Sequence, residues 1–135
     1  MDTKATRHSR YHIFYHIVWI PKYRREVLSG VAAERMGEIL RGIAENKGVE
    51  VVGLEVMPDH IHLFISSPPQ NSPSLLVNWF KGISSHQYNK RFGEKKIRWT
   101  NAYYVGTAGT VSKETIQKYI TEQTKCQDTS AGLEE

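Results

Sequence analysis

VEVVGLEVMPDHIHLFIS, residues 49–66, is the stretch of sequence from which the fold can be predicted. Apolar and β-branched residues dominate it on both sides of Pro58-Asp59, a dipeptide that favours a turn. The pattern therefore predicts two strands, Val49–Met57 and His60–Ser66. Because only two residues separate them, we expect the strands to pair as an antiparallel hairpin.

Two histidines, His60 and His62, lie two residues apart on the second strand of this hairpin. Residues i and i+2 of a strand point to the same face of the sheet, about 7 Å apart along the backbone, so both imidazoles can reach one metal ion. The apolar residues Ile61, Leu63 and Ile65 take the opposite face, which predicts a strand with helices packed on one side. The pair alone is also compatible with hydrogen-bonded surface or interface histidines.

Outward from the hairpin, hydrophobic periodicity predicts five further elements. Strands are predicted at Tyr11–Ile20 and Tyr103–Thr107, and helices at Val31–Lys47, at Leu75–Arg91 and from Ser112 to about Thr124. Gly48 ends the first helix, and Ser72 or Ser74 caps the start of the second. The order predicts an α+β fold, a ferredoxin-like βαββαβ unit with one antiparallel sheet, helices on one face and an added C-terminal helix.

The chain has 135 residues, enough for one domain with a core. We expect a single domain at residues 11–125, a polar basic arm at 1–10 and a polar, disordered tail at 126–135. The only cysteine, Cys126, excludes a disulfide framework and a four-thiolate zinc site within one chain. No apolar run approaches the roughly 20 residues that span a bilayer, and no secretory signal is visible, so we expect a bacterial or archaeal cytoplasmic protein without a membrane partner.

Basic residues gather in two stretches of a chain whose formal net charge is +4. Residues 81–98 contain six of them against one acid, and residues 22–25 contain three more. They are Lys81, Lys90, Arg91, Lys95, Lys96 and Arg98, and Lys22, Arg24 and Arg25. Tyr23, Tyr88, Phe92 and Trp99 lie among these charges. Basic groups neutralise phosphates and aromatic faces stack on unpaired bases, so the pattern is typical of nucleic-acid binding, although a solvated basic surface on an ordinary enzyme shows it too.

The last predicted helix carries Ile116, Tyr119, Ile120 and Gln123 at helical spacing, which places them in one stripe. Tyr119 and Gln123 are neighbours one turn apart. Taken alone, the stripe is better explained by a packing tyrosine with a glutamine at the polar end.

Several motifs, in order, resemble the IS200/IS605 transposases, also called Y1 HUH transposases. Their histidine motif is similar to MPDHIHL at residues 57–63, and their tyrosine motif to IQKYI at 116–120. Further similar stretches are VWIPKYRR at 18–25, Trp99 and YYVG at 103–106. The resemblance covers about residues 10–124.

This resemblance implies a set of roles for the site. Tyr119 would be the nucleophile that cuts and rejoins single-stranded DNA, leaving a 5′-phosphotyrosine. His60, His62 and Gln123 would hold a divalent metal, Mg²⁺ or Mn²⁺. Asp59 is next to this site in the sequence, and we interpret it first as a turn residue and only second as a hydrogen-bond partner of these ligands. DNA hairpins would be bound by the two basic stretches.

The resemblance also implies a homodimer in which Tyr119 and Gln123 of one subunit act with His60 and His62 of the other. Two alternatives stay open. One is a domesticated relative with the same cleavage chemistry, and the other is a non-catalytic ferredoxin-like module that binds nucleic acid. His12 and His16 share a strand face, but they are four positions apart, too far for easy chelation, so no role is predicted for either.

Overall fold

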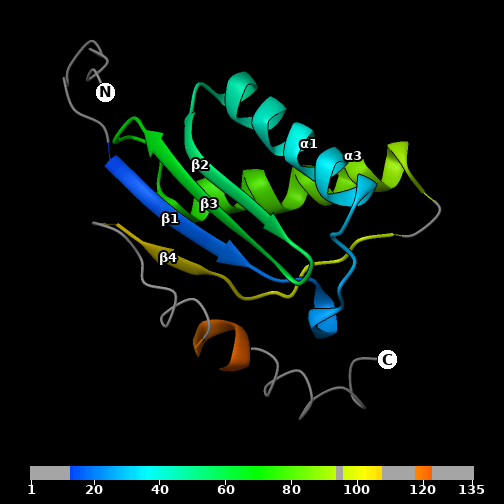
Figure 1. Ribbon diagram of the computed structural model, residues 1–135. Coiled ribbons are helices and arrows are strands. Elements are labelled where there is room, and N and C mark those ends of the chain that lie inside the picture. The colour runs from blue at the N-terminus through cyan, green and yellow to red at the C-terminus, as the bar shows by residue number, and fades with distance from the viewer. Residues whose placement is uncertain (1–12, 94–95, 108–117, 123–135) are drawn as a thin grey trace.

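One four-stranded antiparallel sheet, in the order β2-β3-β1-β4, organises the chain (Figure 1). The structure is a computed structural model that describes residues 13–93, 96–107 and 118–122. In chain order its elements are β1 (Ile13–Trp19), a 3-10 turn (Lys22–Arg24), α1 (Val31–Lys47), β2 (Glu50–Met57), β3 (His60–Ser67), α2 (Pro73–Asn78), a π-helical turn (Trp79–Ile83), α3 (Ser84–Arg91) and β4 (Tyr104–Gly106). Residues 118–122 are helical. The predicted βαββαβ order and α+β class are confirmed.

The hairpin formed by β2 and β3 confirms the prediction from residues 49–66. Its two strands pair from Met57 opposite His60, at the turn, to Glu50 opposite Ser66. The register shifts between Val51 and Gly53, which marks a β-bulge. Beyond the hairpin, β3 pairs with β1, so the histidine-bearing strand lies inside the sheet rather than at its edge.

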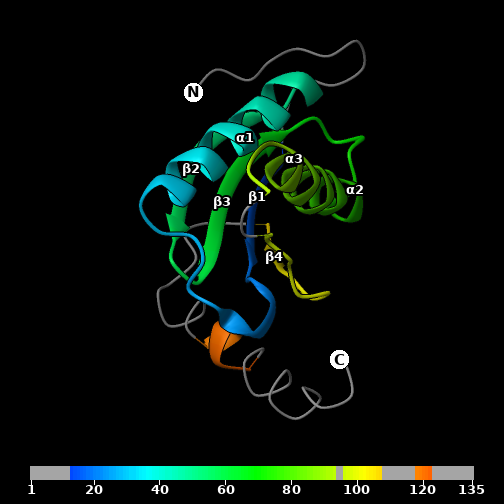
Figure 2. The same cartoon turned by 90° about the vertical axis from the view of Figure 1, so that its right-hand side faces the viewer.

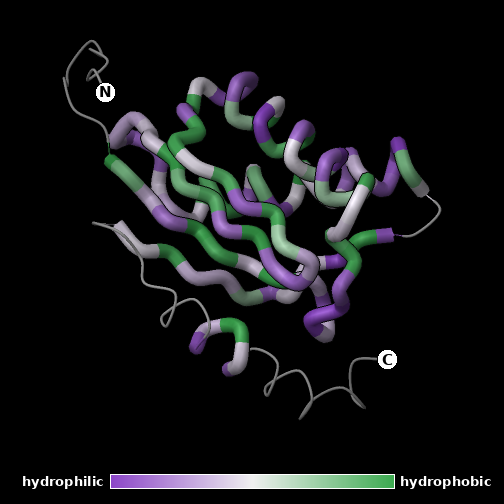
Figure 3. The backbone as a smooth tube through the Cα atoms, viewed as in Figure 1, coloured by the Kyte–Doolittle hydropathy of each residue, from purple (hydrophilic) through white to green (hydrophobic). Residues whose placement is uncertain are grey.

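The core lies between the sheet and the helices, which cover one face of it (Figures 1 and 2). Ile61, Leu63 and Ile65 of β3 are fully buried, as are Met36 and Leu40 of α1. At the hairpin end of β3, the hydrophilic His60 and His62 alternate with the hydrophobic Ile61 and Leu63, and Figure 3 shows both kinds of residue along this strand. Burying one such side chain stabilises the fold by about 1.5–3 kcal/mol, and this fixes which face of β3 remains for polar residues.

Helix α1 has the predicted bounds, and Gly48 ends it in the left-handed conformation at φ 70°. That conformation strains most residues but not glycine. The helix has 17 residues, and in the described parts of the chain no helix is long and apolar enough to cross a membrane.

The second predicted helix differs from Leu75–Arg91 at its start and in its middle. The side chain of Ser72 accepts a hydrogen bond from the backbone N–H of Leu75, so helix α2 begins at Pro73, a residue suited to a first turn. A π-helical turn at Trp79–Ile83 then separates α2 from α3. The prediction of one continuous helix did not include this turn.

Strand ends in the described residues shift by one residue from the prediction. β2 starts at Glu50 because Val49 donates its backbone N–H to the Ala44 carbonyl of α1. β3 continues to Ser67, and β4 is limited to Tyr104–Gly106. In β1, Ile20 lies beyond the strand, while residues 11 and 12 fall outside the described residues, as do the predicted arm and tail.

Candidate active site

Strand β3 presents His60 and His62 on the face of the sheet away from the helices. Ile61 and Leu63, which alternate with them, are fully buried in the core. The two histidine side chains are 18% and 12% exposed, so they are sheltered but reachable from solvent. This division of β3 into a histidine face and an apolar face agrees with the sequence pattern.

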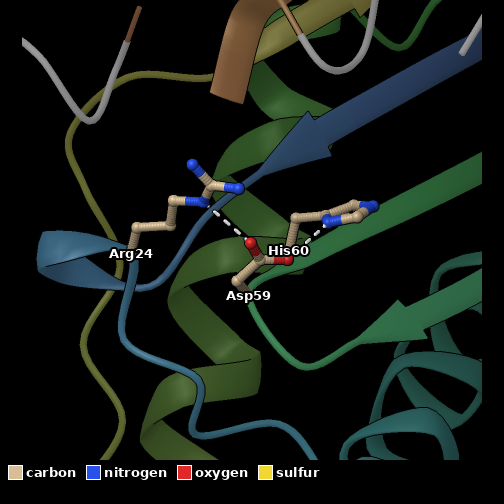
Figure 4. Close-up of polar contacts among 3 residues, drawn as sticks. All are labelled: Arg24, Asp59 and His60. Atoms are coloured by element: carbon tan, nitrogen blue, oxygen red, sulfur yellow. Dashed lines mark hydrogen bonds and ion pairs between the residues drawn. The ribbon is translucent and has the colours of Figure 1, made fainter. Parts of the chain in front are cut away.

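Asp59, in the hairpin turn, contacts the first of these histidines (Figure 4). Its Oδ1 lies 2.9 Å from Nδ1 of His60, and its Oδ2 accepts a hydrogen bond from Nε of Arg24 at 2.8 Å. Burial acts to raise the pKa of Asp59, but the hydrogen bonds and charges of His60 and Arg24 outweigh it and hold the pKa below its ordinary value of 3.8. An ionised carboxylate can only accept, so Nδ1 of His60 must carry the proton, and Nε2 of the neutral ring then offers its lone pair.

Arg24 reaches Asp59 from a turn with an unusual backbone. Tyr23 and Arg24 have φ angles of 61° and 52°, the left-handed region that residues other than glycine rarely occupy. Such conformations cost on the order of 1–3 kcal/mol each and persist only where the surroundings impose them. Arg24 was expected beside Lys22 and Arg25 as a DNA backbone contact, but its guanidinium is engaged by Asp59.

His62 contacts a histidine for which the sequence predicted no role. Its Nε2 lies 2.9 Å from Nδ1 of His16, and its Nδ1 lies 3.5 Å from a carboxylate oxygen of Glu55. His16 is buried and stacks on Phe64, with ring centroids 4.1 Å apart and an interplanar angle of 4°. The register places His16 opposite Phe64 and so diagonally from His62, a neighbourhood that the sequence of β1 alone does not reveal.

His60 and His62 are the side chains on this face of β3 that could bind a divalent metal ion. Burial lowers the pKa of His62 below 6.5, helped by the charge of His16 and opposed by Glu55, so the neutral ring that binds metals is favoured at pH 7. His60 offers a free lone pair, and His62 would exchange its contact with His16 for the ion. Within the described residues, no group of three or more His, Cys, Asp or Glu side chains is arranged to hold a metal. Gln123, the third predicted ligand, lies outside the described residues.

Tyr119 lies in the helical residues 118–122, beside β4 (Figure 1). Its ring packs against Tyr104, with centroids 6.2 Å apart. Its hydroxyl is buried and has no well-formed hydrogen bond in the described structure, and burial raises the pKa of the phenol well above its ordinary value of 10.0. The Thr100 hydroxyl, which itself donates a hydrogen bond to the Ala102 carbonyl, offsets part of this rise in the pKa of Tyr119. In this arrangement the phenol is protonated at pH 7 and is hydrogen-bonded to neither His60 nor His62.

Four of the nine predicted DNA-contacting residues gather around one pocket of about 330 Å³. They are Lys22, Arg25, Lys96 and Arg98. The charges of Lys22 and Arg25 lie 5.8 and 5.4 Å from the centre of the Tyr23 ring. We call this the basic pocket. Lys90 and Arg91 are exposed at the end of α3, away from it, and Lys95 lies outside the described residues.

Lys81, another predicted DNA contact, is turned toward the protein instead. Its Nζ donates to the backbone carbonyls of Thr100 and Ala102 at 2.6 and 3.2 Å. Burial lowers the pKa of Lys81 to about 8, so the ammonium is still mostly charged at pH 7. Lys81 therefore supports the segment next to Tyr119, a role that no spacing in the sequence indicates.

Comparison with known proteins gives consistent matches over most of the chain. The family model described as "Transposase IS200 like" matches residues 9–123. The transposase for insertion sequence element IS200 of Salmonella typhimurium is 38% identical over 128 residues, which cover 90% of this chain and 84% of that protein. The ISDra2 transposase TnpA of Deinococcus radiodurans is 36% identical over 129 residues, which cover 91% of this chain and 92% of that protein.

Two solved structures share the fold. A crystal structure of a Deinococcus radiodurans protein assigned as a transposase matches with a TM-score of 0.79 and 36% identity, over 89% of this chain and 97% of that chain. The structure of a REP-associated tyrosine transposase bound to a REP hairpin matches with a TM-score of 0.56 over 96% of this chain and 75% of that chain. Its identity is 14%, so this second likeness concerns the fold alone.

Proposed function

The chain belongs to the IS200-like family of transposases, and from this premise we propose that it cuts and rejoins single-stranded DNA through a covalent 5′-phosphotyrosine at Tyr119. The observation that carries the proposal is the pair of histidines held on one face of β3, with His60 fixed by Asp59 and His62 favoured in its neutral form. A ferredoxin-like module that only binds nucleic acid needs neither feature.

The proposed reaction is a transesterification at phosphorus. The Tyr119 oxygen loses its proton and bonds to the phosphorus, while the bond from phosphorus to the 3′ oxygen breaks and that oxygen takes up a proton. The phosphodiester energy is kept in the phosphotyrosine, so a 3′-OH of another strand can reverse the step and release the phenol. No ATP is required.

His60, His62 and Gln123 would hold the metal, Mg²⁺ or Mn²⁺. When bound, it supplies a positive charge that polarises the phosphate and stabilises the leaving 3′ oxygen. All three ligands are neutral, so the protein does not cancel this charge. Imidazole ligands favour Mn²⁺ over Mg²⁺ on grounds of softness, and the supply of each ion in the cell would decide between them.

The rate of adduct formation is expected to rise with pH between about 7 and 9. The pKa of the Tyr119 phenol is raised above 10.0, so the attacking phenolate is the minor form throughout this range and grows about tenfold per unit. The pKa of His62 is lowered from 6.5, so its titration ends below this range. Lys81, whose pKa burial lowers to about 8, titrates within it, so the rise is read most directly near pH 7. Single-turnover rates at saturating DNA and constant metal measure the effect. A flat profile would show that phenol deprotonation does not limit the reaction.

The basic pocket is our candidate for contacts with the DNA backbone. Four cations and the Tyr23 ring line it together, the combination that attracts phosphates and stacks on bases. The REP-associated relative with the same fold is bound to a hairpin, and we propose hairpins as the ligand of this chain as well. Lys90, Arg91 and Lys95 remain predicted contacts outside the pocket.

Removing two charges from the basic pocket, by Arg25→Gln with Arg98→Gln, is expected to weaken binding of all hairpins alike. Each lost phosphate contact should lower the slope of log affinity against log salt by about one. Fluorescence anisotropy with a labelled hairpin at several salt concentrations, in EDTA, measures the slope. Arg41→Gln is the matched control, because Arg41 is exposed on α1. An unchanged slope in the double variant would remove the pocket from the DNA interface.

We also propose a homodimer in which the tyrosine helix of one subunit completes the metal site of the other. The lack of a hydrogen bond between the Tyr119 hydroxyl and either histidine in one chain supports a site that is completed by movement or by a partner. Mixing a Tyr119→Phe subunit with a His60→Ala subunit tests this directly. Adduct formation by the mixture, but by neither variant alone, is the expected result for a shared site.

The decisive experiment uses a labelled single-stranded hairpin with Mg²⁺ or Mn²⁺ and denaturing electrophoresis. A protein–DNA adduct that EDTA prevents supports the proposal. Free cut ends without an adduct would indicate a hydrolytic nuclease, and intact DNA at saturating protein would favour the binding module. Hairpin-forming repeats beside the gene would then distinguish a mobile element from a domesticated relative.

A further inference from the structure

The side chain of Arg24 points to a different site from the side chains of its neighbours in the same turn. Tyr23 and Arg25 line the basic pocket, whereas the guanidinium of Arg24 crosses to the hairpin turn and meets Asp59 (Figure 4). The left-handed conformations at residues 23 and 24 accompany this division of side chains between two sites. The turn thus holds Arg24 apart from the pocket that would contact DNA.

The contacts of Asp59 fix its carboxylate at both oxygens. Oδ2 accepts from Arg24 at 2.8 Å and Oδ1 accepts from His60 at 2.9 Å. The side chains of Arg24 and Asp59 are 32% and 19% exposed, so water competes with this pair less than with an ion pair on the open surface. Without Arg24, Oδ2 would lose its donor and the carboxylate could rotate away from His60.

The orientation of Asp59 matters because it selects the tautomer of His60. A carboxylate that accepts from Nδ1 keeps the proton there and turns Nε2 outward, the arrangement found behind many metal-binding histidines. Loss of such an outer partner typically lowers metal affinity about 10- to 100-fold.

We propose that Arg24 is a positioning residue of the metal site, which orients Asp59 so that His60 presents Nε2 to the ion, and that it is not a contact for DNA phosphates. The proposal rests on the proposed function in one respect, since it takes His60 to be a metal ligand. The two adjacent arginines then have different roles: Arg24 supports the metal site, and Arg25 contacts the DNA.

Arg24→Gln and Arg25→Gln form a matched pair for the test, because each removes one positive charge from adjacent positions. Binding of Mn²⁺ alone, without DNA, is followed by the electron paramagnetic resonance signal of the free ion. We expect Arg24→Gln to raise the Mn²⁺ Kd about tenfold. Arg25→Gln should leave it within about twofold and instead weaken hairpin binding in EDTA. Arg24→Lys, which restores a donor and the charge, should recover part of the Mn²⁺ affinity.

A second readout requires no metal. Nitrogen-15 NMR of the imidazoles in metal-free protein reports which ring nitrogen of His60 carries the proton. Wild-type protein and Arg25→Gln should show the proton on Nδ1, and Arg24→Gln should show a mixture of tautomers. A residue with a purely structural role would change the unfolding temperature without changing this ratio.

A double-mutant cycle shows whether Arg24 acts through Asp59. Asp59→Asn should also raise the Mn²⁺ Kd about tenfold, and adding Arg24→Gln to it should raise it no further. The double variant replaces both charges with neutral amides and leaves neither charge unpaired, so it can be compared with Asp59→Asn if Arg24→Gln alone does not fold. Additive effects of the two substitutions would overturn the proposal.

The proposal is also overturned if Arg24→Gln leaves the Mn²⁺ Kd and the His60 tautomer unchanged and merely weakens hairpin binding as Arg25→Gln does. Absence of Mn²⁺ binding by the wild-type protein would overturn it as well. If instead the Mn²⁺ effects appear but Tyr119 forms no DNA adduct, the positioning role stands and the proposed cleavage chemistry fails.

Discussion

Tyr119→Phe is expected to abolish the protein–DNA adduct, lowering its rate of formation by a factor on the order of 10⁴ or more. The substitution removes only the oxygen that would bond to phosphorus in the proposed reaction. Because the Tyr119 hydroxyl lacks a well-formed hydrogen bond in the described structure, its removal should cost the fold little stability. Denaturing electrophoresis of the labelled hairpin measures the adduct.

Hairpin binding provides the internal comparison for this variant. Tyr119→Phe should bind the hairpin with an affinity close to that of the wild type, since the basic pocket is unchanged. Tyr103→Phe is the matched control, because Tyr103 is 40% exposed and its hydroxyl has no part in the proposed reaction. Persistence of the adduct in Tyr119→Phe, with loss in another tyrosine variant, would assign the nucleophile elsewhere.

His60→Ala and His62→Ala are each expected to lower metal-dependent adduct formation on the order of 10³-fold. Each variant removes one of the two imidazoles that β3 presents together, so the ion would lose affinity and its place beside the phosphate. His60→Ala should also leave Asp59 without one of its two partners. Single-turnover assays across a range of Mn²⁺ concentrations distinguish two causes of this loss. If the variant only binds the metal more weakly, excess Mn²⁺ restores part of the adduct formation. If the catalytic geometry is lost, it does not.

His86→Ala is the control for these variants, since His86 is exposed on α3, far along the chain from the hairpin. It should behave like the wild type at every metal concentration. Adduct formation that survives both His60→Ala and His62→Ala, and that EDTA does not prevent, would contradict a metal site on β3.

Tyr119, in the helical residues 118–122, must move before it can react, whereas His60 and His62 need no such movement. A phenol that packs against Tyr104 with its hydroxyl enclosed must become accessible before it can meet a phosphate. Lys81 holds the adjoining Thr100 and Ala102 carbonyls, so it connects the core helices to this segment. The histidine pair, in contrast, is built into the centre of the sheet and needs no large movement.

Much of the fold follows from local patterns in the sequence. The period of apolar residues and the Gly48 stop predict the bounds of α1, and the two-residue turn predicts the pairing of β2 with β3. Alternation along β3 likewise divides its side chains between the core and the histidine face. These features depend on residues a few positions apart, whose geometry is set by the regular backbone itself.

The surroundings of the two histidines were decided only by the tertiary structure. His16 meets His62 across 46 residues of sequence, and Arg24 meets Asp59 across 35. The first contact depends on the register of β1 against β3, and the second on a turn that leaves the ordinary backbone regions. From the sequence, Arg24 was predicted to be one more cation of a basic cluster. A sequence gives the charge of a side chain, but packing determines the direction in which that side chain points. The motif residues were therefore predictable one by one, and their partners became visible only when separate strands and turns were brought together in space.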